Sequence, residues 1–529
     1  MGALELLRSA LEDAAADLRG SSPAPRARPT LERPPKADFG DYSSNAAMLL
    51  APLLGEPPRA VAERLGEAVA GRLEGQLAKV DVAGPGFLNL FLADAWYADA
   101  LAGVIAAGDD YGGGRAAEPE KVNVEFVSAN PTGPIHLGHA RNAAYGDAIC
   151  RLLEFHGHEV AREFYVNDAG AQIAKFAEAI RARARGEVPE EYVGDYVIEL
   201  AEQIPGAAAM DDEALGRAGV EIILAGMRET LERFRVKPFE IWFSEASLYP
   251  DLVEHVLEEL DRLGQTYRAD DALWLRASEH GDDKDRVLVK SDGGYTYMAS
   301  DSAYHQHKRE RGFDRLIDVW GADHHGYVVR TKAAFDALGG DPDKLELLIM
   351  QFVNLVRGGE PVTMSKRTGE FISLDELIDE IGTDAARWFL LARSHDTTIE
   401  VDLELATRES SDNPVYYVQY AHARLAKILA RAAVAAEPVA SAPLEPSERA
   451  VIKKLVAFGA EVGEAAERRA PHRVATYALE LARDFAVFYE QCKVIGGDNE
   501  PFRLALCQAT QRVIARSLDL LGVEAPESM

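Results

Sequence analysis

Cysteine is scarce in this chain of 529 residues. The three cysteines, Cys150, Cys492 and Cys507, lie far apart, and none is part of a CxxC pair. A disulfide framework requires several cysteines that pair, and a zinc ribbon requires cysteines in close pairs. The sequence therefore indicates neither, and we expect a protein of a reducing compartment that holds no zinc.

Long apolar runs are absent as well. No stretch approaches the roughly 18 apolar residues that a membrane-spanning helix requires. Residues 1–20 have the pattern of an acidic amphipathic helix, whereas a secretory signal begins with basic residues. We therefore expect a soluble, cytoplasmic protein with no membrane partner, and the chain length suggests about three domains.

Basic residues are outnumbered, since 57 Lys and Arg stand against 87 Asp and Glu, a formal net charge of −30. Proteins that bind nucleic acid are expected to carry basic surface. The acid is concentrated in residues 187–283, with 24 acidic and 8 basic residues, whereas residues 401–529 have 18 and 15. Contact with a polyanion would therefore depend on local basic patches, with the acidic middle turned away.

The most informative stretch is a strand, turn and helix at residues 122–156. Apolar residues alternate in 122–126, two prolines and a glycine interrupt 128–134, and helical spacing resumes at Ile135. His136 and His139 share one side of the first helical turn, where free N–H groups and the helix dipole favour phosphate. The alternative is a half-formed metal site or two solvated histidines.

A second candidate site is the loop VTMSKRTGE at residues 362–370. Alone, such a charged loop is usually just solvated. Together with the first site, Lys366 is a natural clamp for the β- and γ-phosphates of a nucleotide.

The two segments resemble the paired HIGH and KMSKS motifs of class I aminoacyl-tRNA synthetases, and SANPTGPIHLGHARN resembles the arginyl-tRNA synthetases in particular. Further resemblances follow in the family's order along nearly the whole chain: GDYSSNAAM, GPGFLNLFL, YVNDAGAQI, TYMASDSAYH, WGADHHGY and DNPVYYVQYAHARLAKI. The resemblance implies an arginine–tRNA ligase that uses L-arginine, ATP with Mg²⁺, and tRNA. It also implies an arginyl-adenylate intermediate, transfer to the 2′-hydroxyl of the terminal adenosine, and activation that depends on tRNA. We expect a monomer.

The expected fold class is α/β. Residues 1–118 are expected to form an N-terminal α+β domain, and residues 119–393 a doubly wound, parallel-sheet, Rossmann-like catalytic domain. Its insertions are helical at about 187–235 and strand-rich at about 266–296. Residues 394–529 are expected to form an all-α helix bundle. Locally, residues 344–357 are predicted to be one strand, and a helix is expected from residue 400, broken near Asn413 and Pro414.

In the family, the N-terminal domain contacts the outer corner of tRNA and the bundle reads the anticodon. A dimerisation or purely structural role is the alternative for the first domain. In the bundle, the tRNA-binding candidates are Tyr416, Tyr420 and Arg424. Aromatic residues at helical spacing are more often part of a core, although bases also stack on them.

Substrate residues follow from spacing and from the resemblance. Tyr297 and Asp301 lie four apart where a strand runs into a helix, and a carboxylate suits a guanidinium, although Asp301 could equally cap the helix. The resemblance implies that both hold the arginine side chain. It places four residues around the amino and carboxylate end: Glu125, Ser128, Asn130 and His139. It also implies catalytic roles for His136, His139 and Lys366, and an ATP site formed by His136, Gly138, His139, Met364, Ser365 and Lys366.

The chain departs from the family pattern at two places. Ala322 stands where many members carry Gln, and Asp323 or a water is the candidate replacement. Thr363 stands at the first lysine of KMSKS and Arg367 at its final serine. Two other functions stay open: another synthetase of the same superfamily, which the charge of Asp301 disfavours, and a catalytically silent tRNA-binding relative, which would lack nucleotide binding.

Overall fold

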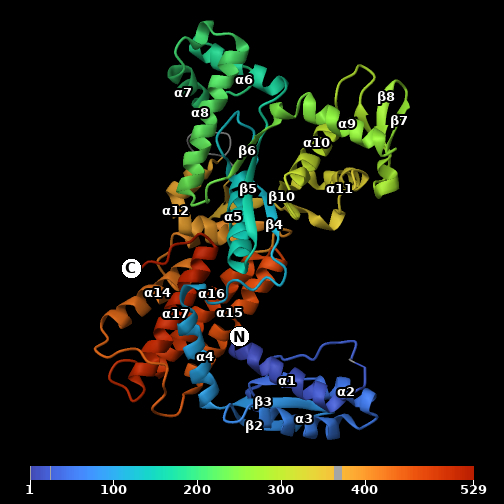
Figure 1. The fold of residues 1–529 in the computed structure, drawn as a ribbon. Helices are drawn as coiled ribbons and strands as arrows, with labels where there is room; N and C mark the ends of the chain where they lie inside the picture. The colour runs from blue at the N-terminus through green and yellow to red at the C-terminus, as the bar shows by residue number, and fades with distance from the viewer. Residues whose placement is uncertain (1, 24, 363–371) are drawn as a thin grey trace.

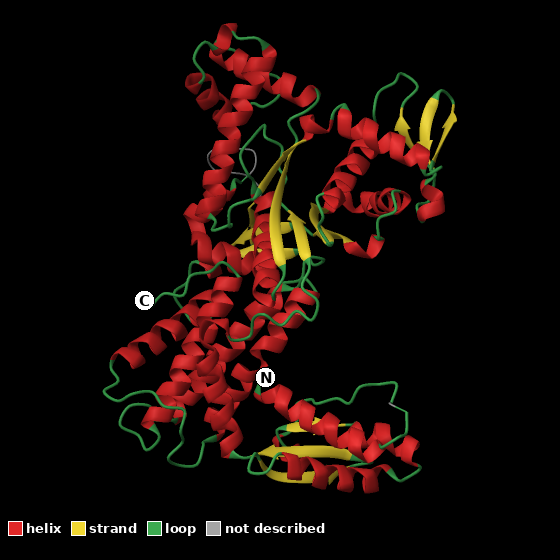
Figure 2. Cartoon of the chain, in the orientation of Figure 1, coloured by secondary structure: helices red, strands yellow, loops and turns green. Residues whose placement is uncertain are grey.

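The computed structural model describes residues 2–23, 25–362 and 372–529 (Figure 1). Met364, Ser365 and Lys366 lie outside this part of the chain. Within it, no helix has the length and apolar character needed to cross a bilayer. The expected α/β class is confirmed, with an α+β unit at the N-terminus and a helical bundle at the C-terminus (Figure 2).

The N-terminal unit is a three-stranded antiparallel sheet in the order β1-β3-β2, packed against helices. Its elements are α1 (Ala3–Arg19), β1 (Tyr42–Ser44), α2 (Ala46–Leu54), α3 (Pro58–Arg72), β2 (Leu77–Ala83) and β3 (Phe87–Leu92). The next helix, α4 (Asp94–Ala107), leaves this unit and packs against α15 and α17 of the bundle (Figure 1). Helix α4 therefore connects the N-terminal unit to the C-terminal bundle.

The central sheet has five parallel strands in the order β11-β10-β4-β5-β6. They are β4 (Lys121–Glu125), β5 (Glu159–Val166), β6 (Ile241–Ser244), β10 (Arg315–Gly321) and β11 (Leu345–Met350). The chain runs outward from β4 to β6 and then returns to β10 on the other side of β4. Open α/β sheets bind ligands at such a switch point, beyond the carboxyl ends of the strands.

Helix α5 (Leu137–His156) is buried along most of its length. It packs on β4, β5 and β10 and, with its other side, on α12 (Leu374–Leu391) and the bundle helices α15 and α16. Gly146 permits the close approach to the sheet, because a Cβ there would lie 2.2 Å from Cγ of Phe126. The helix that begins in the HLGH motif is therefore also the contact between the catalytic sheet and the bundle.

Two insertions project from the sheet (Figure 1). One is helical, and the other holds a three-stranded antiparallel sheet. The first comprises α6 (Ala171–Ala184), α7 (Asp195–Gln203) and α8 (Asp212–Arg233). The second region comprises α9 (Asp251–Arg262), β7 (Thr266–Ala269), β8 (Ala272–Leu275), β9 (Arg286–Val289), α10 (Tyr297–Glu310) and α11 (Val328–Ala337).

The C-terminal bundle consists of four helices, each with a proline at its first or second position. They are α14 (Pro414–Ala430), α15 (Pro446–Glu467), α16 (Pro471–Gln491) and α17 (Glu500–Leu520). Proline suits a helix start, because its missing N–H would have had no partner in the first turn. The expected break at Pro414 is confirmed.

Two local predictions are wrong. Residues 344–357 form two strands in different sheets, because the chain leaves the central sheet at Gln351, whose N–H donates to the His395 carbonyl. The second strand, β12 (Val353–Arg357), pairs with β13 (Glu360–Val362) and β14 (Ile399–Asp402). Strand β14 lies where a helix was expected, because parallel pairing with β12 overrides the helix propensity of its residues. The helical part is short, α13 (Leu403–Ala406).

Candidate active site

The turn after β4 is held in an unusual backbone conformation. Val127 and Ser128 have φ of 68° and 41°, a region that non-glycine residues rarely adopt. The Val127 N–H donates to Oδ1 of Asn142 at 2.7 Å, and the Ser128 hydroxyl donates to Oε1 of Glu125 at 2.9 Å. The hydroxyl also accepts from the Tyr165 N–H at 3.1 Å. Such strain persists only where the surroundings enforce it, and it is concentrated at functional sites.

The two histidines of HLGH lie against each other. His136 is the N-cap of α5, and its Nδ1 accepts from the Gly138 N–H at 3.0 Å. The ring of His139 has its centroid 4.0 Å from that of His136. Burial lowers the pKa of His136, and burial together with His136 lowers the pKa of His139 to about 3. Both imidazoles are therefore neutral near pH 7 and can form hydrogen bonds there without adding charge.

Gly138 has a steric reason to be glycine. A Cβ at this position would lie 2.7 Å from Cε1 of His136. A side chain here would displace the His136 ring and cover the backbone at the helix start.

The HLGH turn is bonded to the chain that follows the lysine loop. The Leu137 N–H donates to the Ile372 carbonyl at 2.8 Å, and the Leu374 N–H donates to the Ile135 carbonyl at 2.9 Å. Ser373 then caps α12 by accepting from the Glu376 N–H. The HLGH turn is therefore bonded to a segment more than 200 residues away in sequence, at the point where the described chain resumes.

Asp301 lies one turn into α10, and other acidic side chains surround it. Burial raises its pKa to about 6, Glu125 adds to this rise, and His305 opposes it. Glu245 is buried as well, and its pKa is raised by burial, by Asp301 and by Asp168. Burial also raises the pKa of Tyr165, with Glu245 and Asp301 adding to the rise. Two carboxylates that oppose each other's ionisation favour a cation between them.

Glu245 was not predicted from the sequence. It begins a short 3₁₀ segment, Glu245–Leu248, directly after β6. The available signal was its place after a strand in an α/β pattern, where sheets of this kind bind ligands. Its burial could not be inferred from that pattern.

The other expected arginine-binding residues lie in different surroundings. Tyr297 is the first residue of α10, one turn before Asp301, and is 76 % exposed. Asn130 accepts a hydrogen bond from Asn167 at 3.2 Å. Asp323 has a side chain that is 78 % exposed and lies 3.4 Å from His324. Its role as a replacement for the family's Gln at Ala322 stays a prediction.

The bundle presents an aromatic and basic surface on α14. The rings of Tyr416 and Tyr420 stack with centroids 6.1 Å apart, and the Arg424 guanidinium lies over Tyr420 at 4.7 Å and over Tyr489 at 5.0 Å. Tyr420 is 40 % exposed, so the alternative that it belongs to the core is wrong. A groove of about 440 Å³ beside it is lined by Arg424, Lys427, Ile428, Arg431, Tyr489, Cys492, Lys493, Val494 and Ile495.

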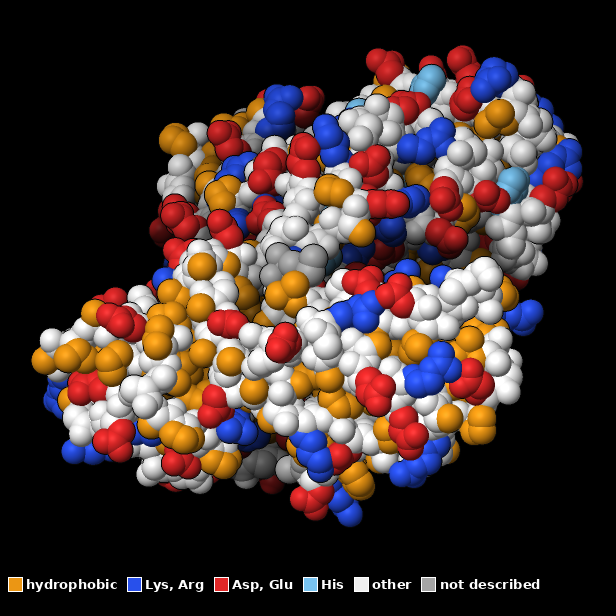
Figure 3. All heavy atoms as spheres, turned by 60° about the horizontal axis from the view of Figure 1, so that its bottom comes forward, with side chains coloured by type: hydrophobic (Ala, Val, Ile, Leu, Met, Phe, Trp, Pro, Cys, Tyr) orange, Lys and Arg blue, Asp and Glu red, His pale blue; other side chains and the backbone are white. Residues whose placement is uncertain are grey.

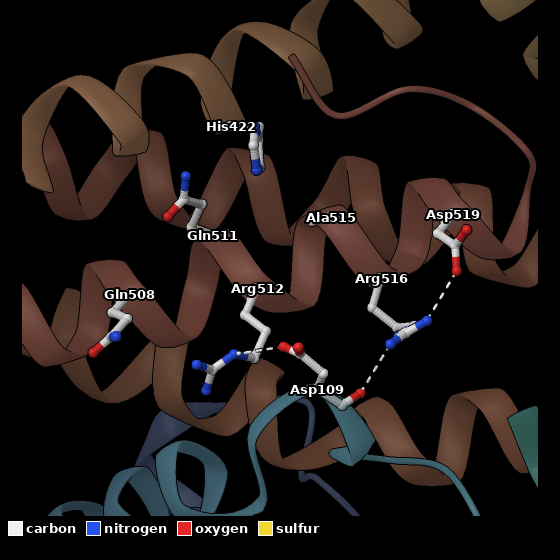
Figure 4. Close-up of a pocket in the computed structure, with 8 residues that line it drawn as sticks. All are labelled: Asp109, His422, Gln508, Gln511, Arg512, Ala515, Arg516 and Asp519. Atoms are coloured by element: carbon white, nitrogen blue, oxygen red, sulfur yellow. Dashed lines mark hydrogen bonds and ion pairs between the residues drawn. The ribbon is translucent and has the colours of Figure 1, made fainter. Parts of the chain in front are cut away.

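A second cavity, of about 410 Å³, lies between α14, α17 and Asp109 (Figure 4). The Nε of Arg512 lies 3.2 Å from Oδ1 of Asp109, and Arg516 lies 2.9 Å from Asp519. His422 uses Nδ1 to contact the Pro526 carbonyl at 2.8 Å. The cations of this cavity already have acidic partners, so it lacks the surplus charge of the groove on α14. On the face of the molecule that Figure 3 shows, basic and acidic side chains are interspersed.

Three protein families match consecutive parts of the sequence. They are described as "Arginyl tRNA synthetase N terminal domain" at residues 4–92, "tRNA synthetases class I (R), catalytic domain" at 101–197 and 215–425, and "DALR anticodon binding domain" at 418–529.

Similar whole proteins carry the same description. The chain is 42 % identical to the arginine–tRNA ligase of Oceanobacillus iheyensis and 44 % identical to that of Bacillus velezensis, each over 94 % of both chains. Among solved structures, a putative arginyl-tRNA synthetase from Campylobacter jejuni has a TM-score of 0.78 at 34 % identity, over 83 % of this chain and 100 % of that one. The Thermus thermophilus arginyl-tRNA synthetase has a TM-score of 0.77 at 25 % identity, over 99 % of both. On sequence, domain order and fold, the chain belongs to the arginyl-tRNA synthetase family of class I aminoacyl-tRNA synthetases.

Proposed function

We propose that this chain activates L-arginine with ATP and attaches it to tRNA. The observation that carries the proposal is the pair of acidic residues Asp301 and Glu245, whose pKa values are both raised. Glu245 follows β6 at the same end of the central sheet at which the HLGH turn follows β4, and we propose that the arginine pocket lies there. A carboxylate meets a guanidinium with two parallel hydrogen bonds, and a second carboxylate adds charge that a neutral amino acid could not satisfy. Tyr297 covers the guanidinium from the rim.

The other end of arginine reaches the turn after β4. Glu125 and Ser128 receive the α-ammonium group, with Asn130 and His139 beside the carboxylate. These residues hold the carboxylate next to the α-phosphorus of ATP, so the two groups react while bound and oriented and need not meet by diffusion. This positioning is the main catalytic contribution, and it requires no covalent bond to the protein. The products of this step are arginyl-adenylate and pyrophosphate.

ATP lies across Gly138, with His136 and His139 beside its phosphates. Because both histidines are neutral, they supply hydrogen bonds, and the positive charge comes from the start of α5 and from Lys366. Met364 and Ser365 accompany Lys366 in the loop. Mg²⁺ enters with ATP, since phosphate oxygens are among its preferred ligands. The chain that follows Lys366 is bonded to the HLGH turn at Ile372 and Leu374, which supports the assignment of Lys366 to the same nucleotide.

The second step transfers the arginyl group to the 2′-hydroxyl of the terminal adenosine of tRNA. The bundle binds the anticodon region, with Tyr420 and Arg424 as a stacking and cationic surface, because bases stack on exposed aromatic rings. The N-terminal unit contacts the outer corner of the tRNA. We assign these roles to domains at residues 1–118, 119–393 and 394–529, and we propose that the protein acts as a cytoplasmic monomer.

Arginine-dependent exchange of labelled pyrophosphate into ATP tests the proposal, with and without tRNA. We expect exchange only when tRNA is present, and we expect Lys366→Ala to slow it by orders of magnitude while arginine affinity stays nearly unchanged. Full exchange without tRNA would contradict the tRNA dependence. Equal loss of exchange and of arginine binding in Lys366→Ala would contradict the assignment of Lys366 to the phosphates.

A further inference from the structure

Lys308, on α10, is a fully buried cation between two carboxylates. Its side chain has no exposed surface, and its Nζ donates to Oε2 of Glu125 at 2.5 Å and to Oδ1 of Asp318 at 2.8 Å. The ammonium also lies 4.3 Å from the centroid of the Tyr304 ring. A buried ammonium is costly to desolvate unless its partners are well placed, so this position needs a reason beyond packing.

The placement of Lys308 follows from helix geometry. Asp301, His305 and Lys308 are spaced by four and three residues, so they share the face of α10 that is turned to the sheet. His305 uses Nδ1 to contact the Asp301 carbonyl at 2.8 Å and Nε2 to contact Asp318, also at 2.8 Å. One face of one helix therefore carries the guanidinium-binding carboxylate at its start and the Lys308 ammonium two turns later.

The neighbouring acid, Glu163, has partners of its own. It accepts from Arg311 at 2.6 Å, from the Tyr304 hydroxyl at 2.9 Å and from Nδ2 of Asn123 at 2.7 Å. Arg311 therefore forms the ion pair with Glu163, whereas Lys308 forms its ion pairs with Glu125 and Asp318.

Glu125 is less completely buried than Lys308. Its side chain keeps 8 % of its surface exposed, whereas Lys308 keeps none. One carboxylate oxygen of Glu125 accepts from Ser128 and the other from Lys308. In the proposed arginine complex, the ligand can therefore contact Glu125 but not Lys308.

We propose that Lys308 is a positioning residue, which fixes the Glu125 carboxylate as an anion aimed at the α-ammonium group of arginine. The inference rests on the proposed function, since it concerns how the same pocket selects an α-amino acid. Burial raises the pKa of Glu125, and Lys308 opposes that rise. Without Lys308, Glu125 would take up a proton and lose its attraction for the ammonium group, while the guanidinium contacts of Asp301 and Glu245 would stay.

The test compares two ligands that differ at one group. Arginine and 5-guanidinopentanoate share the guanidinium and the carboxylate, but the second lacks the α-amino group. Binding of each would be measured by calorimetry with the full chain and by competition in tRNA charging. We expect Lys308→Met to weaken arginine binding about a hundredfold and to change 5-guanidinopentanoate binding by less than about threefold, within the spread of neutral substitutions. Lys308→Arg should restore most of the preference for arginine.

The controls separate this role from a structural one. Lys332→Met, on α11, removes a cation that donates to the Pro342 carbonyl and should leave both ligands unaffected. If Lys308→Met weakens both ligands equally, or neither, the positioning role is wrong. If it does not fold, Lys308→Gln keeps an N–H donor without charge and allows the same comparison. Failure of the unaltered chain to charge tRNA with arginine would instead contradict the proposed function.

Discussion

At the scale of single residues, Asp301 meets the guanidinium group in the proposed arginine complex. Asp301→Asn keeps the shape and removes the charge, so kcat/KM for arginine should fall by about two to three orders of magnitude, the effect of breaking a buried charge pair. The KM for ATP should stay within a small factor. Steady-state charging measures both. Asp271→Asn is the matched control, because Asp271 lies at an exposed turn with a positive φ that asparagine tolerates. An equal loss of kcat/KM in this variant would contradict a specific role of Asp301.

The same residue predicts a pH dependence. The pKa of Asp301 is raised to about 6 by burial and by Glu125. Arginine keeps its guanidinium charge and needs the anion, so its affinity should fall as the pH drops through about 6, approaching tenfold per pH unit below it. The KM for arginine measured between roughly pH 5 and 8 checks this expectation. Asp301→Asn should abolish this titration, and an unchanged profile in the variant would assign it to another group.

Several residues of the proposed site could be predicted from local spacing. His136 and Gly138 follow from a turn and helix start, and Asp301 follows from the strand–helix boundary and the family resemblance. Glu245 and Lys308 could not, because their roles depend on burial and on partners supplied by distant strands. The sequence does not distinguish a buried lysine from an exposed lysine in a polar helix.

At the scale of elements, the contact of α5 with the sheet depends on a missing side chain. Gly146→Ala would place a Cβ 2.2 Å from Phe126, so strand and helix must separate. We expect a loss of about 1–3 kcal/mol, as for other overpacked cores, and a lower melting temperature in scanning fluorimetry. Gly226→Ala, in α8 with no atom within 4 Å of the added Cβ, should instead be neutral or slightly stabilising. The same response in both variants would contradict this explanation.

Element types could be predicted where the hydrophobic period is long and local. The strand, turn and helix predicted at residues 122–156 are β4, the turn after it and α5. The prediction failed at residues 344–357 and at β14, where a turn at Gln351 and parallel pairing between distant strands decide the structure. Such pairing is a tertiary interaction, and a strand of four residues carries too little periodicity to indicate it.

At the scale of the whole molecule, the net charge does not decide RNA binding, because we expect binding to depend on a local basic groove. The chain is strongly acidic, yet the groove beside Tyr420 is lined by four basic side chains: Arg424, Lys427, Arg431 and Lys493. Lys427→Gln and Arg431→Gln should each reduce the slope of log affinity for tRNA against log salt by about 0.7–0.9, one phosphate contact each. Filter binding over a salt series measures the slope. Lys175→Gln, in the helical insertion and paired with Glu191, is the control; an equal change there would show a general charge effect.

Helix α5 connects the catalytic sheet to the C-terminal bundle, because it begins in the HLGH motif and packs on the bundle helices. Arg141 in this helix donates to the carbonyls of Gln351, Ser394 and Thr397, between the sheet and the bundle. The domain order could be predicted from the resemblance, but this shared helix could not, because it depends on how the domains dock.

The most direct measurement is charging of unfractionated tRNA with each of the labelled amino acids in turn, with ATP and Mg²⁺. Arginine alone should become attached, and Asp301→Asn should lose this attachment while still binding tRNA. Attachment of another amino acid would contradict the Asp301 and Glu245 pocket. No attachment at all, with tRNA still bound, would show that this member of the family binds tRNA without catalysing its aminoacylation.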